Sequence, residues 1–499
     1  MYPRRIVLIW FFLWTLSSVA QNNQILYDFD GLPQSLMLNP GAELNLDKHF
    51  GVPLLSNVYG QFGATDPDVN YNNLNNENNE DLDGKLKYLY DLELSNSDFF
   101  VANGRVEVLN IGFRLRNPDY YLSFGMYADG KAFGKYAKES MDLYFFGDDR
   151  NEDGIPEVNE RTDFSEINAV GELVGVFHVG ISKKINERTQ IGARLKLLSG
   201  SLNYNIQDVE GEYFLLGEGP YTHNFEGMEI YFQSSGLDLP MINAGEELNL
   251  GNYPPAVEDW REPISDLFFM SGNFGIGIDL GITHHFDENL TFTASLLDLD
   301  YLKYSKNNVT YTLSEGNFDL SDDDFWDPIP GEEIDYWEEV YNTYAEAGNT
   351  DDLFPIETIN TEYNIGRAPK LYTGLKYRKN NKSYQFKNDL PPYRNVRSMA
   401  NAQMYEVYDE YGFQTYTEFL PATVQWGATI FYAKKFNPYM AAKLTYTVDS
   451  FTYTNIGIGL STHISSFNFF LAADNLIGIF SPKDSNYQSL QMGMSILIP

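Results

Sequence analysis

Apolar and polar residues alternate along much of the chain from about residue 50 onward. Strict alternation places successive side chains on opposite faces of a β-strand, so that one face meets apolar surroundings and the other polar surroundings. The pattern is clearest in segments 274–282, 290–296, 423–432, 443–449 and 456–461. The sequence therefore predicts an all-β protein.

Two architectures produce long alternating strands: a soluble sandwich or propeller, and a transmembrane barrel. The segments run for about 9 to 15 residues, whereas ordinary strands have about five or six and membrane-spanning strands about 9 to 11. Their polar faces carry Gly, Asn, Thr, Lys and Asp, which suits a wet or crowded lumen. These features favour a closed antiparallel transmembrane β-barrel whose apolar face meets lipid.

The connections between the segments alternate between short and long, as in bacterial outer-membrane barrels with short periplasmic turns and long extracellular loops. With a first strand near 50–63 and a last strand near 488–498, the pattern predicts about 14 strands. The last strand is expected to pair with the first, which leaves no strand edge in the hydrocarbon. Short turns are predicted at 117–118, 186–189, 287–288, 379–382, 437–438 and 465–466, and long connections near 64–104, 128–169, 200–268, 304–368 and 384–420.

Residues 1–20 have the composition of a secretory signal peptide. Two arginines precede an apolar run over residues 6–16, and small residues follow at 18–20. The apolar run is too short to span a bilayer as a stable helix. A buried N-terminal helix is the alternative, but the order of charge, apolar run and small residues favours cleavage and export.

Residues 21–49 precede the first strand and contain irregularly spaced apolar side chains, among them Leu26, Phe29 and Leu36. Such a segment needs a cover, because exposing apolar surface to water is unfavourable. We expect it to fold into the barrel mouth as a plug, with an extended periplasmic tail as the alternative. The expected organisation is a signal peptide over 1–20, the plug over 21–49 and the barrel over 50–499.

Charge and composition exclude several classes of protein. The chain has 70 acidic and 34 basic residues, and this formal charge of −36 repels nucleic-acid phosphates. It has no cysteine, which excludes disulfides, thiolate metal sites and a cysteine nucleophile. Beyond the first twenty residues no run of 18 apolar residues occurs, so no transmembrane helix is expected. Nucleic acid is therefore not an expected partner. The barrel pattern makes outer-membrane lipid an expected partner.

Short motifs add to the barrel pattern: Asn39-Pro40 before the first strand, Leu297-Asp298-Leu299, and Ala473-Asp474-Asn475-Leu476 before the last strand. Together with Val19-Ala20-Gln21 at the expected cleavage site, they resemble the FadL-type outer-membrane barrels, and within these the Bacteroidota branch, which includes PorV-like proteins and a largely uncharacterised family. The barrel pattern covers nearly the whole mature chain, whereas the motifs cover few residues. The chain departs from the usual pattern at its C-terminus, which ends in Pro499 and not in an aromatic residue.

The resemblance implies a place in the cell outer membrane and two kinds of function. FadL-like members pass hydrophobic molecules through a lumen with an N-terminal hatch, and PorV-like members assist protein secretion. We therefore expect transport of hydrophobic small molecules or an accessory role in secretion, with a hydrophobic ligand or secretion-machinery proteins as partners. The alternative is a non-conducting binding or scaffold barrel associated with type IX secretion or gliding machinery. A secreted soluble β-sandwich that binds carbohydrate is a third reading.

One motif predicts a metal site. Residues 149–160 match the calcium-loop spacing D-x-[DN]-x-[DN]-G-x5-E position for position. Oxygens at positions 1, 3 and 5 converge on one ion, the glycine permits a sharp turn, position 7 offers a carbonyl, and the final glutamate closes the shell. The alternative is a solvated acidic loop that matches by chance. The predicted calcium ligands are Asp149, Asn151, Asp153, the Ile155 carbonyl, Glu157 through a water, and Glu160.

Catalysis has little support in the sequence, and no enzyme activity is predicted. The chain contains no G-x-S-x-G, P-loop or H-E-x-x-H motif. His284 and His285 are neighbours in a predicted strand, so their side chains point to opposite faces and would not chelate one metal. Inside the lumen, Arg114, Arg194, Lys196 and Lys443 are expected to pair with Asp279 and Asp449 and so to block or gate the pore.

Overall fold

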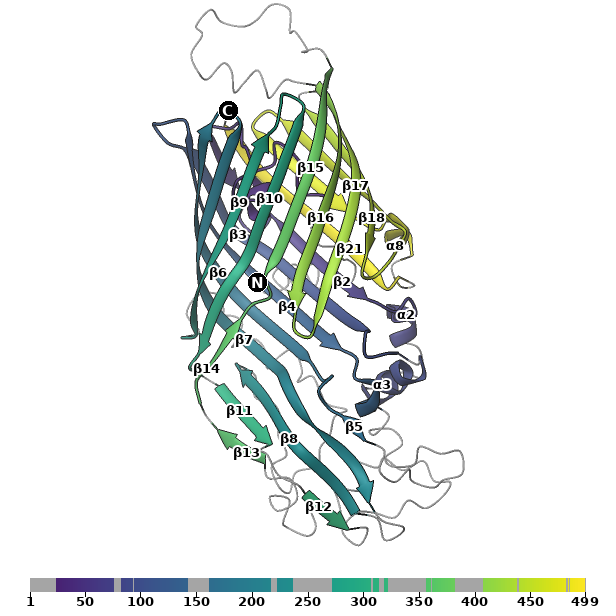
Figure 1. Ribbon diagram of the computed structural model, residues 1–499. Helices are drawn as coiled ribbons and strands as arrows, with labels where there is room; N and C mark the ends of the chain where they lie inside the picture. Colours follow the sequence, from purple (N-terminus) through teal and green to yellow (C-terminus); the bar gives the residue numbers. More distant parts are fainter. Residues whose placement is uncertain are drawn as a thin grey trace, which may run out of the picture.

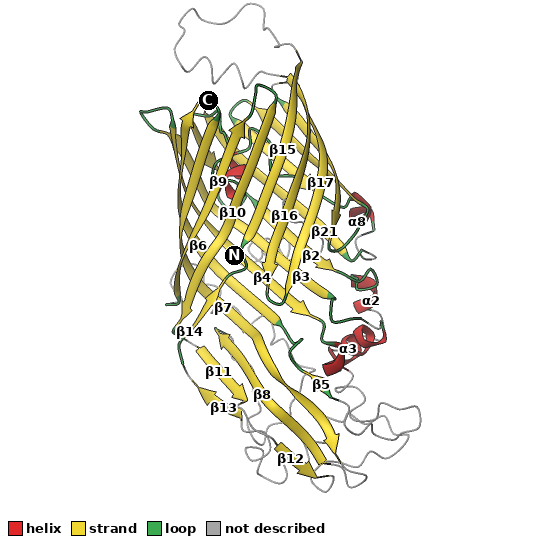
Figure 2. Ribbon diagram, in the orientation of Figure 1, coloured by secondary structure: helices red, strands yellow, loops and turns green. Residues whose placement is uncertain are grey.

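Fourteen strand positions of the computed structural model close into one antiparallel barrel (Figures 1 and 2). The predicted all-β fold class is therefore confirmed. Within the part of the chain that the structure describes, no helix is both long and apolar enough to cross a membrane. The described residues are 24–75, 82–92, 94–141, 161–216, 222–236, 272–306, 308–313, 318–321, 356–359, 361–381, 407–437, 439–481, 483 and 485–498.

The barrel strands follow one another around the wall in chain order. The first position is shared by two short strands, and the other thirteen are single strands. They are β1 (Lys48–Gly51) with β2 (Val58–Ala64), β3 (Phe99–Arg114), β4 (Tyr120–Lys135), β6 (Ala169–Asn186), β7 (Thr189–Leu216), β9 (Phe274–His285), β10 (Leu290–Tyr304), β15 (Lys370–Asn381), β16 (Val407–Leu420), β17 (Thr423–Asn437), β18 (Met440–Asp449), β19 (Asn455–Ile464), β20 (Phe467–Ala473) and β21 (Tyr487–Ile498).

The first and last strands close the barrel. β1 and β2 are separated by residues 52–57, and each pairs antiparallel with β3 on one side and β21 on the other. His49 lies opposite Leu497, and Phe62 lies opposite Gln488. The predicted pairing of last strand with first is confirmed. Every barrel strand thus has a hydrogen-bonded neighbour on both sides, as backbone groups in hydrocarbon require.

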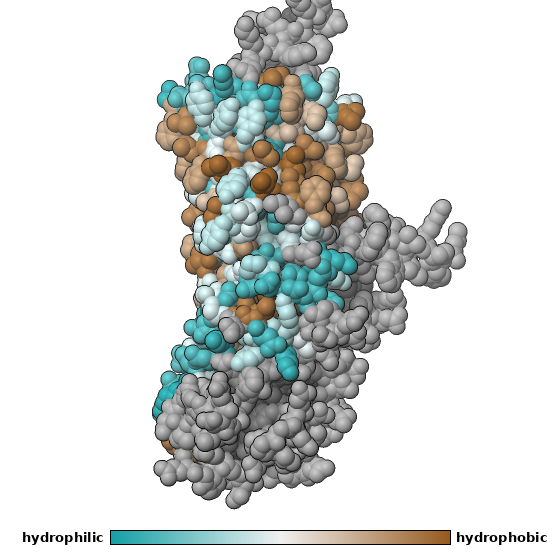
Figure 3. All heavy atoms as spheres, turned by 90° about the vertical axis from the view of Figure 1, so that its right-hand side faces the viewer, coloured by the Kyte–Doolittle hydropathy of each residue, from teal (hydrophilic) through white to brown (hydrophobic). Residues whose placement is uncertain are grey.

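The strands are apolar outside and polar inside, the reverse of a soluble domain. In β17, Val424, Trp426 and Ile430 are 42–59% exposed, whereas the alternating Gln425 and Thr429 are fully buried. Figure 3 shows hydrophobic side chains gathered over the barrel wall, with hydrophilic side chains at the rim above them and on the surface below. A closed barrel with an apolar outer wall is a membrane-spanning structure. The protein is therefore located in the outer membrane.

The predicted alternation of short and long connections is wrong in one region. The short turn predicted at 379–382 is wrong, because residues 379–381 belong to β15. The next described strand begins at Val407, 26 residues after the end of β15. β16 occupies much of the long connection predicted at 384–420. The true short turn is Pro421-Ala422, between β16 and β17.

The alternation in β16 is hidden because aromatic rings lie on both of its faces. Tyr408 and Tyr416 point inward and are at most 6% exposed, whereas Tyr411 and Phe413 point outward and are about half exposed. A period-two pattern can be recognised only where the two faces differ in polarity. In this strand the inward rings remove that contrast.

Other predicted loops contain regular structure beyond the barrel. β7 has 28 residues, and its second half leaves the wall to pair with β8 and β5 (Figure 1). β8 pairs in turn with β11 and β12, and β11 pairs with β13. We call this the distal sheet. β14 (Tyr363–Gly366) instead extends the wall by pairing with the end of β10. The elements outside the wall are β5 (Thr162–Asp163), β8 (Thr222–Ser235), β11 (Asn308–Leu313), β12 (Phe318–Ser321), β13 (Ile356–Ile359), α2 (Tyr71–Leu74), α3 (Leu82–Asp91) and α8 (Leu476–Phe480).

The two rims of the barrel differ. The C-terminal rim, where β21 ends, carries the short turns at 115–119, 187–188, 286–289 and 465–466. The distal rim continues into the distal sheet (Figure 2). The first described residues lie inside the wall: residues 24–47, which we call the N-terminal segment, are mostly buried and contain the 3-10 helix η1 (Pro33–Met37).

Candidate functional site

The N-terminal segment packs apolar side chains against the inner wall of the barrel. Ile25, Leu26 and Leu32 have no exposed surface. Tyr27 stacks on Tyr372 of β15, with ring centroids 5.0 Å apart. Burying each such side chain contributes about 1.5–3 kcal/mol. The cluster comprises Ile25, Leu26, Tyr27, Phe29, Leu32 and Leu38 from the segment and Leu297, Tyr372, Tyr416, Phe470 and Ala472 from the wall.

Two buried cations of the wall hold the backbone of the segment. Lys443 Nζ donates to the Tyr27 carbonyl at 2.5 Å, and Arg194 donates to the Met37 carbonyl at 2.9 Å. The Lys443 ammonium also lies 4.1 Å from the centroid of the Phe431 ring. These contacts satisfy backbone carbonyls that the segment does not pair within itself, which a buried irregular chain needs.

The motif Asn39-Pro40-Gly41 fits against two glycines of the wall. A Cβ on Gly192 of β7 would lie 1.9 Å from the Pro40 carbonyl oxygen, and one on Gly281 of β9 would lie 2.1 Å from Asn39 Oδ1. The Asn39 amide also donates to the Ile282 carbonyl at 3.3 Å. The motif therefore fits against the wall only because these two wall positions are glycines without a Cβ atom.

Replacing Gly281 by alanine is expected to displace the motif and to destabilise the barrel by about 1–3 kcal/mol, as overpacking does. Gly171→Ala on β6 is the matched control, since a Cβ there meets its nearest neighbour at an ordinary 3.6 Å. Urea unfolding of both variants in liposomes measures the difference. Equal stability of the two variants would show that the motif does not depend on this close contact.

Carboxylates of the segment make ion pairs with the wall near the C-terminal rim. Lys376 Nζ lies 2.8 Å from an Asp30 oxygen and 3.7 Å from an Asp28 oxygen. Arg378 also contacts Asp30. Further along the segment, His285 Nε2 lies 3.0 Å from a Glu43 oxygen. The segment is thus held by apolar packing, backbone hydrogen bonds and charge together.

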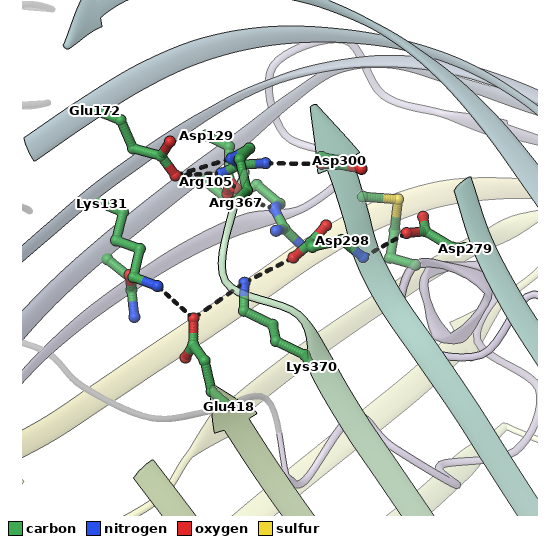
Figure 4. A network of polar contacts seen from close by, with 12 residues as sticks. Arg105, Asp129, Lys131, Glu172, Asp279, Asp298, Asp300, Arg367, Lys370 and Glu418 are labelled. Carbon is green, nitrogen blue, oxygen red and sulfur yellow. Dashed lines mark hydrogen bonds and ion pairs between the residues drawn. The ribbon is translucent and has the colours of Figure 1, made fainter. Parts of the chain in front are cut away.

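A network of buried ion pairs crosses the lumen (Figure 4) and meets the N-terminal segment at Met37 through Arg194. Arg367 Nη2 lies 2.7 Å from both Asp129 and Glu172, and Lys370 links Asp298 at 2.8 Å to Glu418 at 3.8 Å. Its six cations and six carboxylates balance formally. We call it the ionic network; it comprises Arg105, Lys131, Arg194, Lys196, Arg367 and Lys370 with Asp129, Glu172, Asp279, Asp298, Asp300 and Glu418.

Lys196 occupies the centre of three carboxylates in this network. Asp279, Asp298 and Asp300 are buried, and their oxygens lie within 4.8 Å of one another, close enough to share a metal ion. The Lys196 ammonium lies 2.9, 2.7 and 2.7 Å from these three side chains. An ammonium group therefore takes the position that a divalent cation would need.

The predicted lumen pairs are right for two cations and wrong for the others. Arg194 and Lys196 contact Asp279 as predicted, at 2.6 and 2.9 Å. Arg114 instead donates to the Pro118 carbonyl at 2.7 Å, because it lies at the C-terminal rim, and Lys443 binds segment carbonyls. Asp449 does not pair with a cation as predicted; its carboxylate accepts hydrogen bonds from the backbone amides of Phe451 and Thr452 in the turn after β18.

Aromatic rings fill the lumen on the distal side of the ionic network. Phe451 stacks on Tyr487 at 4.8 Å and meets Phe99 edge-on at 5.7 Å. The Asp449 carboxylate holds the turn by accepting from Phe451 N at 2.9 Å, which turns the ring inward. Gly63 makes room, since a Cβ there would lie 2.9 Å from this ring. We call this group, Phe99, Val101, Phe133, Leu420, Phe451 and Tyr487, the aromatic cluster.

Little empty space remains between the N-terminal segment and the ionic network. A cavity of about 20 Å³ lies there, lined by residues that include Leu38, Tyr59, Arg105, Lys370 and Tyr416. A buried water needs about 10–15 Å³ of such space. The cavity therefore accommodates one water or two.

Most members of the ionic network escape prediction from sequence. Only Arg194, Lys196 and Asp279 were expected there. Some of the others lie at inward positions of alternating strands, such as Lys131 in β4 and Glu418 in β16, whereas Arg367 lies between β14 and β15. A charged residue on the polar face of a predicted barrel strand is the signal that could have identified them.

The predicted calcium ligands Asp149, Asn151, Asp153, Ile155, Glu157 and Glu160 all lie outside the described residues.

His284 and His285 make separate contacts: His284 Nδ1 lies 2.9 Å from Thr189 Oγ1, and His285 Nδ1 lies 2.8 Å from Thr291 Oγ1.

Comparison with solved structures finds outer-membrane transporters at low similarity. The toluene transporter TbuX of Ralstonia pickettii is 11% identical, with a TM-score of 0.37, covering 97% of this chain and 99% of that one. The toluene transporter TodX of Pseudomonas putida is 10% identical, with a TM-score of 0.34, over 96% and 95%. A FadL homologue of Pseudomonas aeruginosa is 9% identical, with a TM-score of 0.37, over 96% of each chain.

A search of curated protein sequences finds no match. The sequence does match one family profile over residues 40–474, which extends from the Asn39-Pro40-Gly41 motif to the end of β20 and so includes nearly the whole barrel. The chain therefore belongs to DUF5723, a family of unknown function.

Proposed function

We propose that the protein is a gated transporter of hydrophobic small molecules in the outer membrane, and that residues 21–49 are its plug. One observation carries this proposal: the N-terminal segment fills the lumen with apolar side chains that pack on an apolar patch of wall. If the segment withdraws, Leu297, Phe470 and Ala472 become the lining of a chamber that favours an apolar ligand.

Three barriers lie in series along the proposed path. The short turns orient the C-terminal rim toward the periplasm, so the N-terminal segment is the periplasmic barrier. The ionic network is the middle barrier, and the aromatic cluster is the external one. Opening requires all three to move, so the structure corresponds to the closed state of the proposed transporter.

The test is a reversible lock on the plug. Thr293 Oγ1 of the wall donates to Asp28 Oδ2 of the segment at 2.7 Å, and the natural chain has no cysteine. We expect the oxidised variant D28C/T293C to lose uptake of radiolabelled toluene and dodecane by outer-membrane vesicles, and to regain it on reduction. The two single-cysteine variants are the controls, and they should take up both probes under either condition.

Uptake that is the same in the oxidised and reduced double variant would contradict the plug. Absence of uptake by the unmodified protein would contradict transport of these probes. These two results are distinguishable, because the first leaves transport intact and the second does not.

A non-conducting binding or scaffold barrel is the second candidate. The balanced ionic network favours it, because breaking buried ion pairs is expensive and a permanently closed lumen avoids that step. The distal sheet would then supply the surface for partners. An association with type IX secretion or gliding machinery, a PorV-like role and an origin in the Bacteroidota are part of this second candidate. Calcium binding by residues 149–160 stays a prediction in either case.

A further inference from the structure

An apolar groove of about 470 Å³ lies on the outer wall of the barrel. It crosses the four adjacent strands β6, β7, β9 and β10. One row of paired residues runs across these strands: Phe177, Leu197, Ile276 and Tyr301. The last three of these side chains are 54–67% exposed. Its volume is in the range of sites that bind small ligands, about 300–1,000 Å³.

Two small residues that line the groove, Ser199 and Gly275, lie among these large ones. In the neighbouring row, Gly175 lies opposite Ser199, Ser199 opposite Phe274, and Phe274 opposite Lys303. Ser199 and Lys303 both line the groove. The large apolar side chains thus surround a floor of small residues, and a lysine lies at the edge of the groove.

The groove lies at the distal boundary of the hydrocarbon. β9 has 12 residues and begins at Phe274, so it rises about 40 Å along the strand and about 30 Å along the barrel axis at the usual tilt. That length matches the hydrocarbon thickness of a bilayer, about 30 Å. Its C-terminal end is at the C-terminal rim, so Phe274 and Lys303 lie at head-group depth in the other leaflet.

The charge at this position identifies the occupant. The Lys303 side chain is 49% exposed and contacts Glu362, which is 57% exposed. An exposed ion pair of this kind is weak, and a phosphate can compete with the carboxylate for the ammonium. We propose that the groove binds one lipid of the distal leaflet, with an acyl chain along Leu197, Phe274 and Ile276 and its phosphate on Lys303.

The proposal is tested by native mass spectrometry of the mature barrel titrated with phosphatidylglycerol. Lys303→Gln is expected to weaken retention about fivefold, the value of one cation near a phosphate, about 1 kcal/mol. Glu362→Gln is expected to strengthen it, because the competing carboxylate is gone. Lys183→Gln is the matched control, since Lys183 also lies beside an outward tyrosine, Tyr120, but on the other side of the membrane.

The apolar part has its own control. Ile276→Ala should weaken retention, whereas Ile430→Ala should not, although Ile430 is similarly exposed, at 59%, on β17. All these side chains are on the outer surface, and heat-modified migration on gels verifies that each variant folds. Equal retention by the two alanine variants would overturn the site. Retention that is insensitive to Lys303→Gln, or equal for uncharged diacylglycerol, would overturn the phosphate contact and with it the proposal.

Discussion

Replacing Lys196 by alanine is expected to destabilise the barrel by about 3–5 kcal/mol, the usual loss when one partner of a buried ion pair is removed. The side chain has no exposed surface and contacts Asp279, Asp298 and Asp300. Arg194, Arg367 and Lys370 still reach one carboxylate each, but no cation then lies between all three. Urea unfolding in liposomes measures the loss.

The same variant is expected to acquire a dependence on divalent cations. Three carboxylates within 4.8 Å of one another offer the oxygen ligands that calcium prefers. Millimolar calcium should therefore restore part of the lost stability in Lys196→Ala and leave the unmodified protein unchanged.

Lys434→Ala supplies the control for this pair of results. Lys434 also lies 2.9 Å from a carboxylate, that of Asp409, but its side chain is 35% exposed. The Lys434→Ala variant should lose only about 0–1 kcal/mol of unfolding stability, and calcium should not restore it. If Lys196→Ala and Lys434→Ala were equally stable, the buried contacts of Lys196 would not be stabilising the barrel.

Deleting residues 22–38 is expected to open the periplasmic half of the lumen while the distal half stays closed. The deletion removes the apolar side chains that cover Ala472. A cysteine at Ala472, 2% exposed in the intact protein, should change from unreactive to fully labelled by a membrane-impermeant maleimide. The chain has no other cysteine that could react.

A cysteine at Val101 tests the remaining barriers. Val101 is 1% exposed and belongs to the aromatic cluster, on the other side of the ionic network. It should stay unlabelled after the deletion when the reagent is added from the C-terminal rim. Labelling at both positions would show that the segment alone closes the lumen, and labelling at neither would show that it is not a plug.

The wall of the barrel could be predicted from sequence wherever its two faces differ in polarity. β9, with Phe274 and Ile276 outside and glycines or Asp279 inside, has the expected alternation. β16 does not, because Tyr408 and Tyr416 face the lumen. The pattern reports the polarity of each face. Where tyrosines face the lumen, both faces of the strand carry aromatic residues, and the alternation cannot be recognised from sequence.

The contents of the lumen could not be predicted in the same way, because they depend on register. Lys196 meets Asp298 across 102 residues of sequence, and that contact also needs a β-bulge between Leu296 and Leu299. Asp298 has a φ of 60° there, a left-handed conformation that aspartate tolerates better than most residues. The motif around it was visible in the sequence, but its part in the bulge was not.

The motif Ala473-Asp474-Asn475-Leu476 likewise has a local role that sequence did not reveal. Asn475 Oδ1 accepts from Gly478 N at 3.1 Å, which caps α8, and Asn475 Nδ2 donates to the Tyr487 carbonyl at 2.6 Å. The motif thus joins the connection before the last strand to the first residue of that strand. Short polar side chains are favoured at such helix starts because they satisfy unpaired backbone amides.

The position of β21 has a consequence for how the protein is made. These twelve residues pair with both the first and the thirteenth strand positions and so close the ring of strands. A nascent or prematurely terminated chain lacking them would present two unpaired edges, which are prone to aggregation. The topology therefore makes closure depend on β21, because without it the wall would remain an open sheet with an unpaired edge on each side.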